Sequence, residues 1–357
     1  MNIKPAEKPA AGKRARKSGT NPVKLSDVAQ LAKVSPASVS RVFNDPQLVS
    51  EEVRERVLRA AEVLNWVPNG AAKALATLRT RTIGVLIPTL SHQNFATLIE
   101  GLQRQLGKAQ YTLILACIET DPTLRLQQAR KMIERGIDWM VMVGEAQPTA
   151  LLELLDSHQV PYLFTYTNGR NPEHVCIGID NYAAAATATQ HLLDLGHTRF
   201  ALIVHQFDAN DRIQLRMDGA RDTLAHAGLA IRPHHVKRVD RRYLASAREG
   251  LREIMANDGA RPTAVICSND SVAFGAMVEA QALGIRVPED LSIVGFDDID
   301  SSQHLSPPLT TIHIPAQEMG EAVAQYILDS VKGLPSPAIP VLTADLVIRS
   351  STARPPD

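Results

Sequence analysis

The chain has 357 residues, enough for two or three domains, and its hydrophobic content of 45% is sufficient for large cores. No apolar run approaches the length of a membrane span. Residues 1–22 lack the apolar stretch of a secretory signal, so we expect a cytoplasmic protein without a membrane partner. The net charge is zero, but residues 1–82 carry +8 and the remainder −8. A basic N-terminal part and an acidic remainder are typical of a protein that binds phosphate groups through its N-terminal part only.

The first 23 residues are rich in Pro, Ala, Lys and Gly and cannot bury a core. We therefore predict that residues 1–23 form a disordered basic tail. This tail either adds sequence-independent affinity for DNA, which would weaken with salt, or only keeps the protein in solution.

Residues 24–68 have the pattern of a small helical domain. Two short amphipathic helices between Leu25 and Asn44 are joined by a tight turn at 33–35. Ser35 and Pro36 are typical of the N-cap and the first residue of a second helix. A third helix is expected over Glu51–Leu64, with Ser50 as its cap. The side chains predicted to face inward are Val28, Ala29, Leu31, Ala32, Val39, Val42, Val53, Val57, Leu58, Ala61 and Leu64.

The second of these helices turns Ala37, Ser38 and Arg41 outward at spacings of three and four. Small residues followed by one long donor suit a helix that enters a major groove. There Arg41 can offer two N–H groups to O6 and N7 of guanine. The alternative interpretation is an ordinary helical hairpin with a solvated polar face.

This head resembles the DNA-binding domain of the LacI/GalR family of transcription regulators. The matching residues are Asp27-Val28-Ala29, Val34-Ser35, Val39-Ser40-Arg41-Val42, Asn44 and Val49-Ser50. The resemblance implies that Arg41 reads bases while neighbouring polar residues contact phosphates. The DNA-binding residues predicted in the head are Ser35, Pro36, Ala37, Ser38, Ser40, Arg41, Asn44 and Ser50. Two departures are Lys24 for a capping Thr and Lys33 for a turn Gly, which costs about 1 kcal/mol if φ is positive.

Residues 69–81 form a predicted hinge, because a helix from Asn69 to about Ala76 is too short to be stable alone. The family resemblance, in Pro68-Asn69 and 72–76, implies that this segment folds on operator DNA and pairs with its dimer mate. It also implies that Asn69 contacts DNA and that Leu75 enters the minor groove. The alternative is a plain linker. Gly70 stands where the family often has Arg, which removes one phosphate contact.

From residue 82 onward, apolar strand-like runs alternate with helical stretches, which predicts parallel sheets covered on both faces. The predicted strands are Ile83–Pro88, Tyr111–Cys117, Trp139–Val143, Pro161–Tyr166, Cys176–Ile179, Arg199–Val204, Val265–Ser268, Leu291–Phe296 and Asp345–Ser350. The predicted helices include Phe95–Lys108, Leu124–Arg135, Tyr182–Leu195, Arg216–Ala227, Ala245–Asn257 and Ser271–Leu283. Because these strands and helices are too many for one sheet, we expect two lobes with a ligand cleft at the carboxyl ends of the strands.

The chain is expected to cross from one lobe to the other at 178–181 and to return near 309–314. We assign about 82–180 and 312–340 to lobe 1, about 181–311 and 341–350 to lobe 2, and 351–357 to a tail. This half resembles the periplasmic sugar-binding-protein fold that the family carries as its sensor, most specifically over 191–203, 262–277, 283–298 and 307–312. The predicted fold class is thus an all-α helix-turn-helix head and hinge helix followed by a doubly wound, two-lobed α/β sensor.

Polar residues at strand ends are the candidates for ligand contact. Asn269 and Asp297 each follow a strand, Tyr166 ends another, and Arg216 matches the R-x-x-G of the family, whose Arg commonly binds ligand. Asn94 and Phe95 match a contact position of the family. The predicted ligand-binding residues are Asn94, Phe95, Tyr166, Arg216, Asn269 and Asp297. Alternatives stay open: Asp270 as an N-cap or a ligand group, Asp298 as a loop carboxylate, and Phe95 as a core residue.

Four cationic residues, His92, His205, Arg212 and Arg216, favour a sugar acid or phosphosugar over a neutral sugar. No G-x-S-x-G, HExxH, CxxC or phosphate-loop motif occurs, so we expect no catalytic residue, metal or cofactor. Asp297 and Asp298 are adjacent and point to opposite faces, so they do not form a catalytic pair. The three cysteines have no pairing or metal spacing, which suits a reducing compartment.

The resemblance and the residues together predict a DNA-binding regulator, most simply a repressor, that acts on an inverted-repeat operator. Its operator affinity would be controlled by a sugar, sugar acid or phosphosugar bound between the lobes. A leucine-repeat tail like that of tetrameric relatives is missing, so we expect a homodimer. The alternative is a sugar-binding protein or sugar-metabolising enzyme without operator function.

Overall fold

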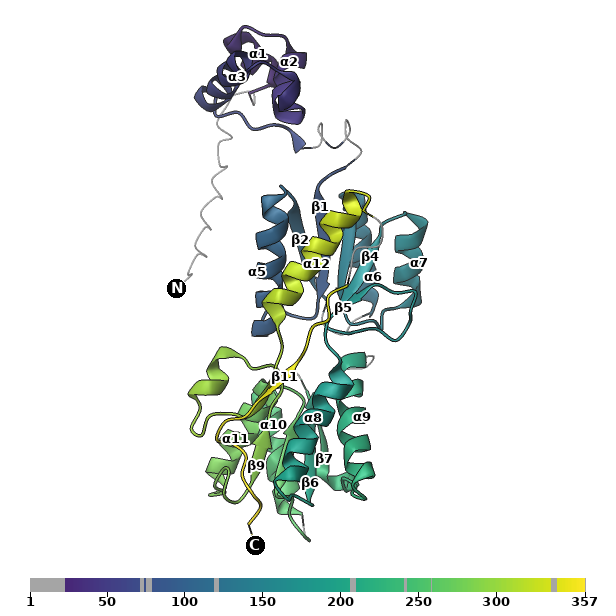
Figure 1. Ribbon diagram of the computed structural model, residues 1–357, viewed down its shortest axis with the longest axis vertical. Helices are drawn as coiled ribbons and strands as arrows, with labels where there is room; N and C mark the ends of the chain where they lie inside the picture. The colour runs from purple at the N-terminus through teal and green to yellow at the C-terminus, as the bar shows by residue number, and fades with distance from the viewer. Residues whose placement is uncertain are drawn as a thin grey trace, which may run out of the picture. The chain divides into compact units, whose positions relative to one another are not determined.

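The computed structural model describes residues 23–70, 74, 79–118, 122–205, 210–240, 243–257, 259–334 and 339–356. The chain divides into two compact units, Met1–Leu78 and Arg79–Asp357, which we describe separately (Figure 1). The predictions for residues 1–22 and for Leu75 lie outside the described residues.

The first unit is a three-helix head. Its elements are α1 (Leu25–Ala32), α2 (Pro36–Asn44), a 3₁₀ turn (Pro46–Leu48) and α3 (Glu51–Val63). Val28, Val39 and Val57, one from each helix, are fully buried at its centre. Ser35 caps α2 as predicted, because its hydroxyl accepts a hydrogen bond from Ser38 N at 3.1 Å.

The turn between α1 and α2 passes through Lys33 at φ 54°, the left-handed conformation that the Gly-to-Lys departure made costly. Arg56 of α3 stabilises this helix end, since its guanidinium donates to Ala32 O at 2.8 Å and to Lys33 O at 3.0 Å. A side chain from the third helix therefore satisfies carbonyls that α1 leaves unpaired.

Two predictions for the head are wrong, and a third, for Ser50, is only partly confirmed. Leu31 and Leu58 are exposed by 49% and 42%, and Ala60 is buried instead. The inner face of α3 is a narrow stripe centred on Val57 and Ala61, because three short helices enclose only a small core. Ser50 has N-cap backbone geometry, but its side chain makes no capping hydrogen bond.

The second unit contains two α/β lobes, each with a wholly parallel main sheet, as predicted. The first sheet has the order β2-β1-β3-β4-β5 and the second β7-β6-β8-β9. The strands are β1 (Thr82–Ile87), β2 (Thr112–Cys117), β3 (Trp139–Val143), β4 (Tyr162–Thr165), β5 (Cys176–Ile177), β6 (Phe200–His205), β7 (Val236–Val239), β8 (Ala264–Cys267) and β9 (Ser292–Val294). An antiparallel pair, β10 (Thr311–His313) and β11 (Asp345–Val347), forms a separate small sheet.

Helices cover both faces of each main sheet (Figure 1). In lobe 1, α5 (Gln93–Lys108) and α12 (Ala316–Val331) cover one face, and α6 (Pro122–Glu134) and α7 (Thr149–Ser157) cover the other. In lobe 2, α8 (Asn181–Asp194) and α9 (Asp211–His226) lie opposite α10 (Tyr243–Ala256) and α11 (Asp270–Ala282). Successive residues of β1 and β6 therefore enter different cores, as the period of two in a strand requires.

Helix α12, which returns from lobe 2, packs closely on α5 of lobe 1. A Cβ atom at Gly320 would lie 2.2 Å from Leu98 O, and one at Gly101 would lie 2.4 Å from Gln317 O. The absence of side chains at these two positions therefore lets the helix backbones touch. This contact fixes the segment after β10 to lobe 1.

The structure corrects three further predictions. Strand β7 was not predicted, because this edge strand carries Lys237 and Arg238 at its centre and has no apolar alternation. Helix α9 begins at Asp211, five residues before the predicted start at Arg216. Residues 351–353 are not a tail: Ser351 is fully buried, and its carbonyl accepts from Ile293 N at 2.8 Å beside β9.

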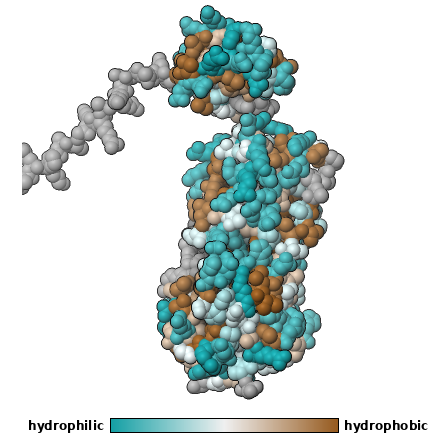
Figure 2. Space-filling model, turned by 60° about the vertical axis from the view of Figure 1, so that its left-hand side comes forward, coloured by the Kyte–Doolittle hydropathy of each residue, from teal (hydrophilic) through white to brown (hydrophobic). Residues whose placement is uncertain are grey.

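Hydrophilic residues dominate the face of the sensor seen in Figure 2, where apolar residues form separate patches. Exposed apolar residues are scattered over several elements, including Leu90, Leu244, Val278, Leu283 and Ile348. Within the described ranges, no helix is both long and apolar enough to cross a membrane.

Candidate functional site

The outer face of α2 carries the predicted DNA-binding residues. Ser35, Pro36, Ala37 and Arg41 are exposed, and Ser38, Ser40 and Asn44 are half-buried. Among the described residues of the head, no hydrogen bond or ion pair holds the Arg41 guanidinium. The helix thus presents small side chains around one unengaged cation.

The half-buried polar residues of α2 are held in fixed positions. Asn44 Nδ2 donates to Ser40 Oγ at 3.1 Å, and the hydroxyls of Ser35 and Ser38 are 3.0 Å apart. Ser50 and Asn69 are exposed outside α2. Their roles, like the others on this face, remain predictions.

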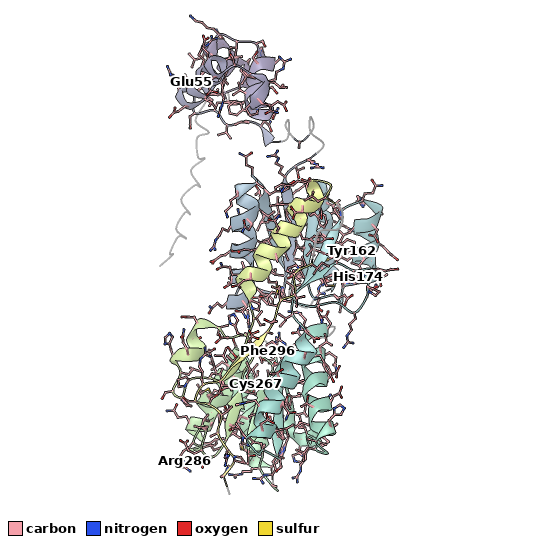
Figure 3. The ribbon with its side chains drawn as sticks, in the orientation of Figure 1. Glu55, Tyr162, His174, Cys267, Arg286 and Phe296 are labelled. Carbon is pink, nitrogen blue, oxygen red and sulfur yellow. The ribbon has the colours of Figure 1, made fainter. Side chains whose placement is uncertain are left out.

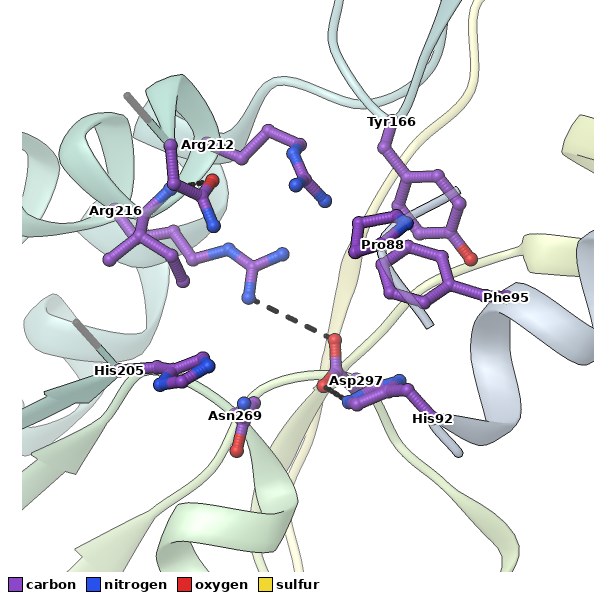
Figure 4. A pocket seen from close by; sticks show the side chains of 11 residues that line it. Pro88, His92, Phe95, Tyr166, His205, Arg212, Arg216, Asn269 and Asp297 are labelled. Atoms are coloured by element: carbon purple, nitrogen blue, oxygen red, sulfur yellow. Dashed lines mark hydrogen bonds and ion pairs between the residues drawn. The ribbon is translucent and has the colours of Figure 1, made fainter. Parts of the chain in front are cut away.

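The second unit has a pocket where the carboxyl ends of the strands of lobe 2 meet lobe 1 (Figure 4). Its volume is about 50 Å³. Five of the six predicted ligand-binding residues line it, from both lobes. The lining residues are Pro88, His92, Phe95, Tyr166, His205, Asn210, Arg212, Ile213, Arg216, Asn269 and Asp297.

Asn94 is the predicted residue that does not line the pocket. Its buried side-chain amide donates to Asp297 O at 2.9 Å, so it connects α5 of lobe 1 to the loop after β9 of lobe 2. The structure therefore gives Asn94 a positioning role, and its predicted ligand contact stays a prediction.

Asp297 lies at the centre of the contact between the lobes. Its carboxylate is 2.9 Å from His92 Nε2 of lobe 1 and 3.9 Å from Arg216 Nη1 of lobe 2. Burial of the His92 imidazole opposes its charge, but the Asp297 carboxylate outweighs this effect and raises the pKa of His92. The backbone of Asp297 has φ 127°, a conformation that costs free energy and is held by its surroundings.

Arg216 is fixed from several sides. Its Nε donates to Asn181 Oδ1 at 2.9 Å and its Nη1 to Ser268 O at 2.7 Å. Its guanidinium carbon lies 3.6 Å from the centroid of the Phe296 ring, which Figure 3 places where lobe 2 faces lobe 1. Burial lowers the pKa of Arg216 to about 10, and the nearby Asp297 carboxylate opposes this, so the side chain remains charged at neutral pH.

Two buried polar atoms of the pocket make no hydrogen bond to a described residue. Among the described residues, none hydrogen-bonds to Tyr166 Oη or to His92 Nδ1. Burial raises the pKa of Tyr166 well above its usual value, so its hydroxyl stays protonated and can donate. Because buried polar groups are normally satisfied, these atoms are available to hydrogen-bond a water molecule or a polar ligand in this space.

The open alternatives for neighbouring residues are now decided. Asp270 is neither an N-cap nor part of the pocket lining: Asn269 caps α11, and the buried Asp270 carboxylate accepts from Ser302 Oγ at 2.6 Å. Asp298 pairs with Arg349 at 2.7 Å, away from the pocket. Phe95 is both buried and part of the lining, packed edge-on against Tyr166.

Comparisons with known proteins agree with this architecture. The model for the lacI family of bacterial regulatory proteins matches residues 24–69, and a periplasmic binding protein-like domain matches residues 189–352. The ribose operon repressor of Haemophilus influenzae is 32% identical over 311 residues, which cover 86% of this chain and 92% of that protein. The chain belongs to the LacI family.

Further LacI-family proteins match over most of their length. The HTH-type transcriptional repressor PurR of Aliivibrio fischeri is 33% identical over 310 residues, covering 86% of this chain and 91% of its own. The Lac repressor dimer bound to operator and the anti-inducer ONPF is 26% identical, with a TM-score of 0.83 and coverage of 93% and 100%. The protein is therefore a LacI-type DNA-binding transcriptional regulator, from a family of repressors, with a ligand-binding sensor.

Several residues of this LacI-family sensor escaped the predictions. Pro88, Asn210 and Ile213 line the pocket. Asn210 and Ile213 were missed because the predicted helix began only after them. Asp211 joins the lobes, because its Oδ2 accepts from Glu145 N at 2.6 Å and from Ala146 N at 3.1 Å. The Asn-Asp pair before an amphipathic run was a helix-start signal that could have revealed them.

Proposed function

We propose that this regulator is a homodimeric repressor of the bacterial cytoplasm that binds an inverted-repeat operator through α2 of each protomer. Its operator affinity changes when a small sugar-like effector, a sugar, sugar acid or phosphosugar, binds between the sensor lobes. The family consists of repressors, and we propose that the effector is bound without chemical change. The observation that carries the proposal is the pocket between the lobes, with unsatisfied polar atoms facing it.

The pocket explains how binding could be transmitted. His92 and Asn94 of lobe 1 contact Asp297 of lobe 2 beside this pocket. We propose that an effector bound there rearranges these contacts and so changes the relative angle of the lobes. Ligand and operator affinities are then reciprocally coupled, by on the order of 1–3 kcal/mol.

The test of this function is a binding selection from random duplex DNA at moderate salt, followed by thermal-shift screening with sugars, sugar acids and phosphosugars. We expect enrichment of a palindrome and at least one compound that raises the melting temperature, since it binds only the folded state. That compound should also change operator affinity. No preference for any palindrome, with or without the compounds, would contradict the proposal.

The hinge provides a separate prediction. Replacing Leu75 by alanine should weaken operator binding, because the minor-groove wedge of the family would be lost, while effector affinity stays nearly unchanged. Operator affinity and effector affinity are measured on the same preparation, with Leu90→Ala, an exposed leucine of the sensor, as the matched control. Unchanged operator affinity would remove Leu75 from the interface.

The N-terminal tail provides another prediction. Residues 1–22 contain six Lys and Arg and one Glu. If the tail contacts phosphates, its deletion should reduce the slope of log affinity against log salt by about 0.9 for each lost contact, equally on operator and random DNA. A deletion that leaves the slope unchanged would show that the tail only keeps the protein in solution.

A further inference from the structure

Asn181 is a fully buried residue that contacts both sides of the pocket without lining it. It is the first residue of α8, directly after the chain has crossed from β5 of lobe 1 into lobe 2. Its neighbours in the pocket lining are Tyr166, which follows β4 of lobe 1, and Arg216, from α9 of lobe 2. One side-chain amide therefore joins a pocket residue of each lobe.

The orientation of the Asn181 amide is fixed by what its neighbours can do. The Arg216 Nε atom only donates, and it lies 2.9 Å from Asn181 Oδ1. The main-chain oxygen of Tyr166 only accepts, and it lies 2.8 Å from Asn181 Nδ2. The same nitrogen lies 3.5 Å from Ile179 O. Asparagine meets both needs, because its side chain is a donor toward lobe 1 and an acceptor toward lobe 2.

The backbone of Tyr166 is held by this contact. It has φ 65°, in the left-handed region, which costs free energy in a residue with a bulky side chain. The crossover packs directly against the next residue, because a Cβ atom at Gly178 would lie 2.3 Å from Thr167 N. The segment after β4 is therefore attached to the crossover, and Asn181 holds its first carbonyl group.

Asn94 makes the corresponding contact in the opposite direction. Its amide donates from α5 of lobe 1 to the main-chain oxygen of Asp297, which also lines the pocket and also has a positive φ. Tyr166 and Asp297 are thus each held in a costly backbone conformation by a buried asparagine of the other lobe. The placement of both residues in the pocket therefore depends on how the lobes are oriented.

A separate contact between the lobes provides a measure of their orientation. Asp211, at the start of α9, accepts hydrogen bonds from the backbone amides of Glu145 and Ala146 in lobe 1. Among the described residues, none of these three is a hydrogen-bond partner of Asn181. A change at Asn181 acts on these two amides through the orientation of the lobes, without a direct bond.

We infer that Asn181 is a positioning residue of the effector site, which sets the placement of Tyr166 against Arg216 and couples it to the angle between the lobes. An effector that contacts both residues meets a pair whose spacing this amide fixes. Loss of the donor toward Tyr166 loosens lobe 1 against lobe 2 at the crossover, so the contacts of Asp211 open more often. The inference rests on the proposed effector-binding function and names a residue that gives the site its geometry.

The experiment measures amide hydrogen exchange in the full chain, without effector or DNA, by mass spectrometry with fragmentation to single residues. The reporting amides are those of Glu145 and Ala146. The reference amides are those of the central strands β1 and β6, which stay protected until the lobe that contains them opens. Because effector and operator are both left out, the result does not depend on whether the protein binds either.

Two variants of Asn181 separate its contacts. Asn181→Asp keeps an acceptor for Arg216, whose charge keeps the new carboxylate ionised, but has no donor for the carbonyl of Tyr166. Asn181→Leu removes both hydrogen bonds at a similar volume. The matched control is Asn257→Asp, because Asn257 is exposed and its amide donates to Glu253 O of α10 within lobe 2.

We expect Asn181→Asp to accelerate exchange of the reporting amides about tenfold, the effect of losing one hydrogen bond, and to leave the reference amides unchanged. Asn181→Leu should show the same selective acceleration, with a lower melting temperature because Arg216 Nε loses its acceptor. Asn257→Asp should leave both sets of amides unchanged.

Two outcomes would overturn the inference. If the reporting amides of Asn181→Asp exchange as in wild type, Asn181 serves only to hold Arg216. If reporting and reference amides accelerate equally in both Asn181 variants, the residue contributes to general stability and does not position the pocket. Failure of the proposed function would be seen differently, as wild-type protein that binds no effector or operator while the selective exchange pattern is intact.

Discussion

Replacing Arg41 by alanine should relax operator specificity and cost roughly 1–3 kcal/mol of binding free energy at one base pair, as expected for a bidentate arginine–guanine contact. The guanidinium is exposed on α2, and the described head contains no partner for it, so its donors remain available to a base. Truncation should leave the head folded, because the core residues Val39 and Val42 lie on the opposite face. The measurement is a binding selection that compares the base preferences of both proteins.

A matched control for this prediction is Arg54→Ala, which removes another exposed arginine of the head. Arg54 lies on α3 and pairs with Glu51 at 3.3 Å, so its loss should leave the base preferences unchanged. If Arg41→Ala and wild type select the same sequences, Arg41 does not read bases. The polar residues around it would then account for recognition through phosphate contacts alone.

Replacing Arg216 by alanine should abolish the effector response and also destabilise the sensor by roughly 3–5 kcal/mol, because one partner of a buried ion pair is removed. Asn181 and the carbonyl of Ser268 would lose their donor, and the Asp297 carboxylate would lose its counter-ion inside the protein. The head, a separate compact unit, should still bind operator. Chemical denaturation and operator titrations with and without effector measure both effects.

The companion variant Asp297→Asn separates ligand contact from stability. Asparagine keeps the shape of the side chain and tolerates positive φ better than most residues, so the loop should persist. We expect loss of the effector response with a smaller loss of stability than for Arg216→Ala. Arg286→Ala serves as the control, because Arg286 is largely exposed and its pair with Asp290 contributes little. A normal effector titration of either pocket variant would contradict the assignment of this site.

Local patterns sufficed where neighbours in sequence are also neighbours in space. Ser35 and Pro36 indicate where α2 begins. The spacing of Val39 and Val42 defines its buried face, so Arg41 is predicted to lie on the outer face. The apolar strands of the sensor were predicted for the same reason, because a strand buried on both faces is a nearly continuous run of apolar residues. The short strand β7 was missed because an edge strand is only half-enclosed and carries polar residues.

Residue patterns along the chain predicted helix α2, the parallel two-lobed architecture and five residues of the pocket lining, because each is recorded in periodicity or at the end of a strand. The folded structure was needed to show that Asn94 holds the backbone of Asp297, that Ser351 belongs to the core and that Asp270 lies outside the pocket. These roles depend on contacts between residues 32 to 203 positions apart. No local pattern records such contacts, because their partners meet only when distant parts of the chain have folded together.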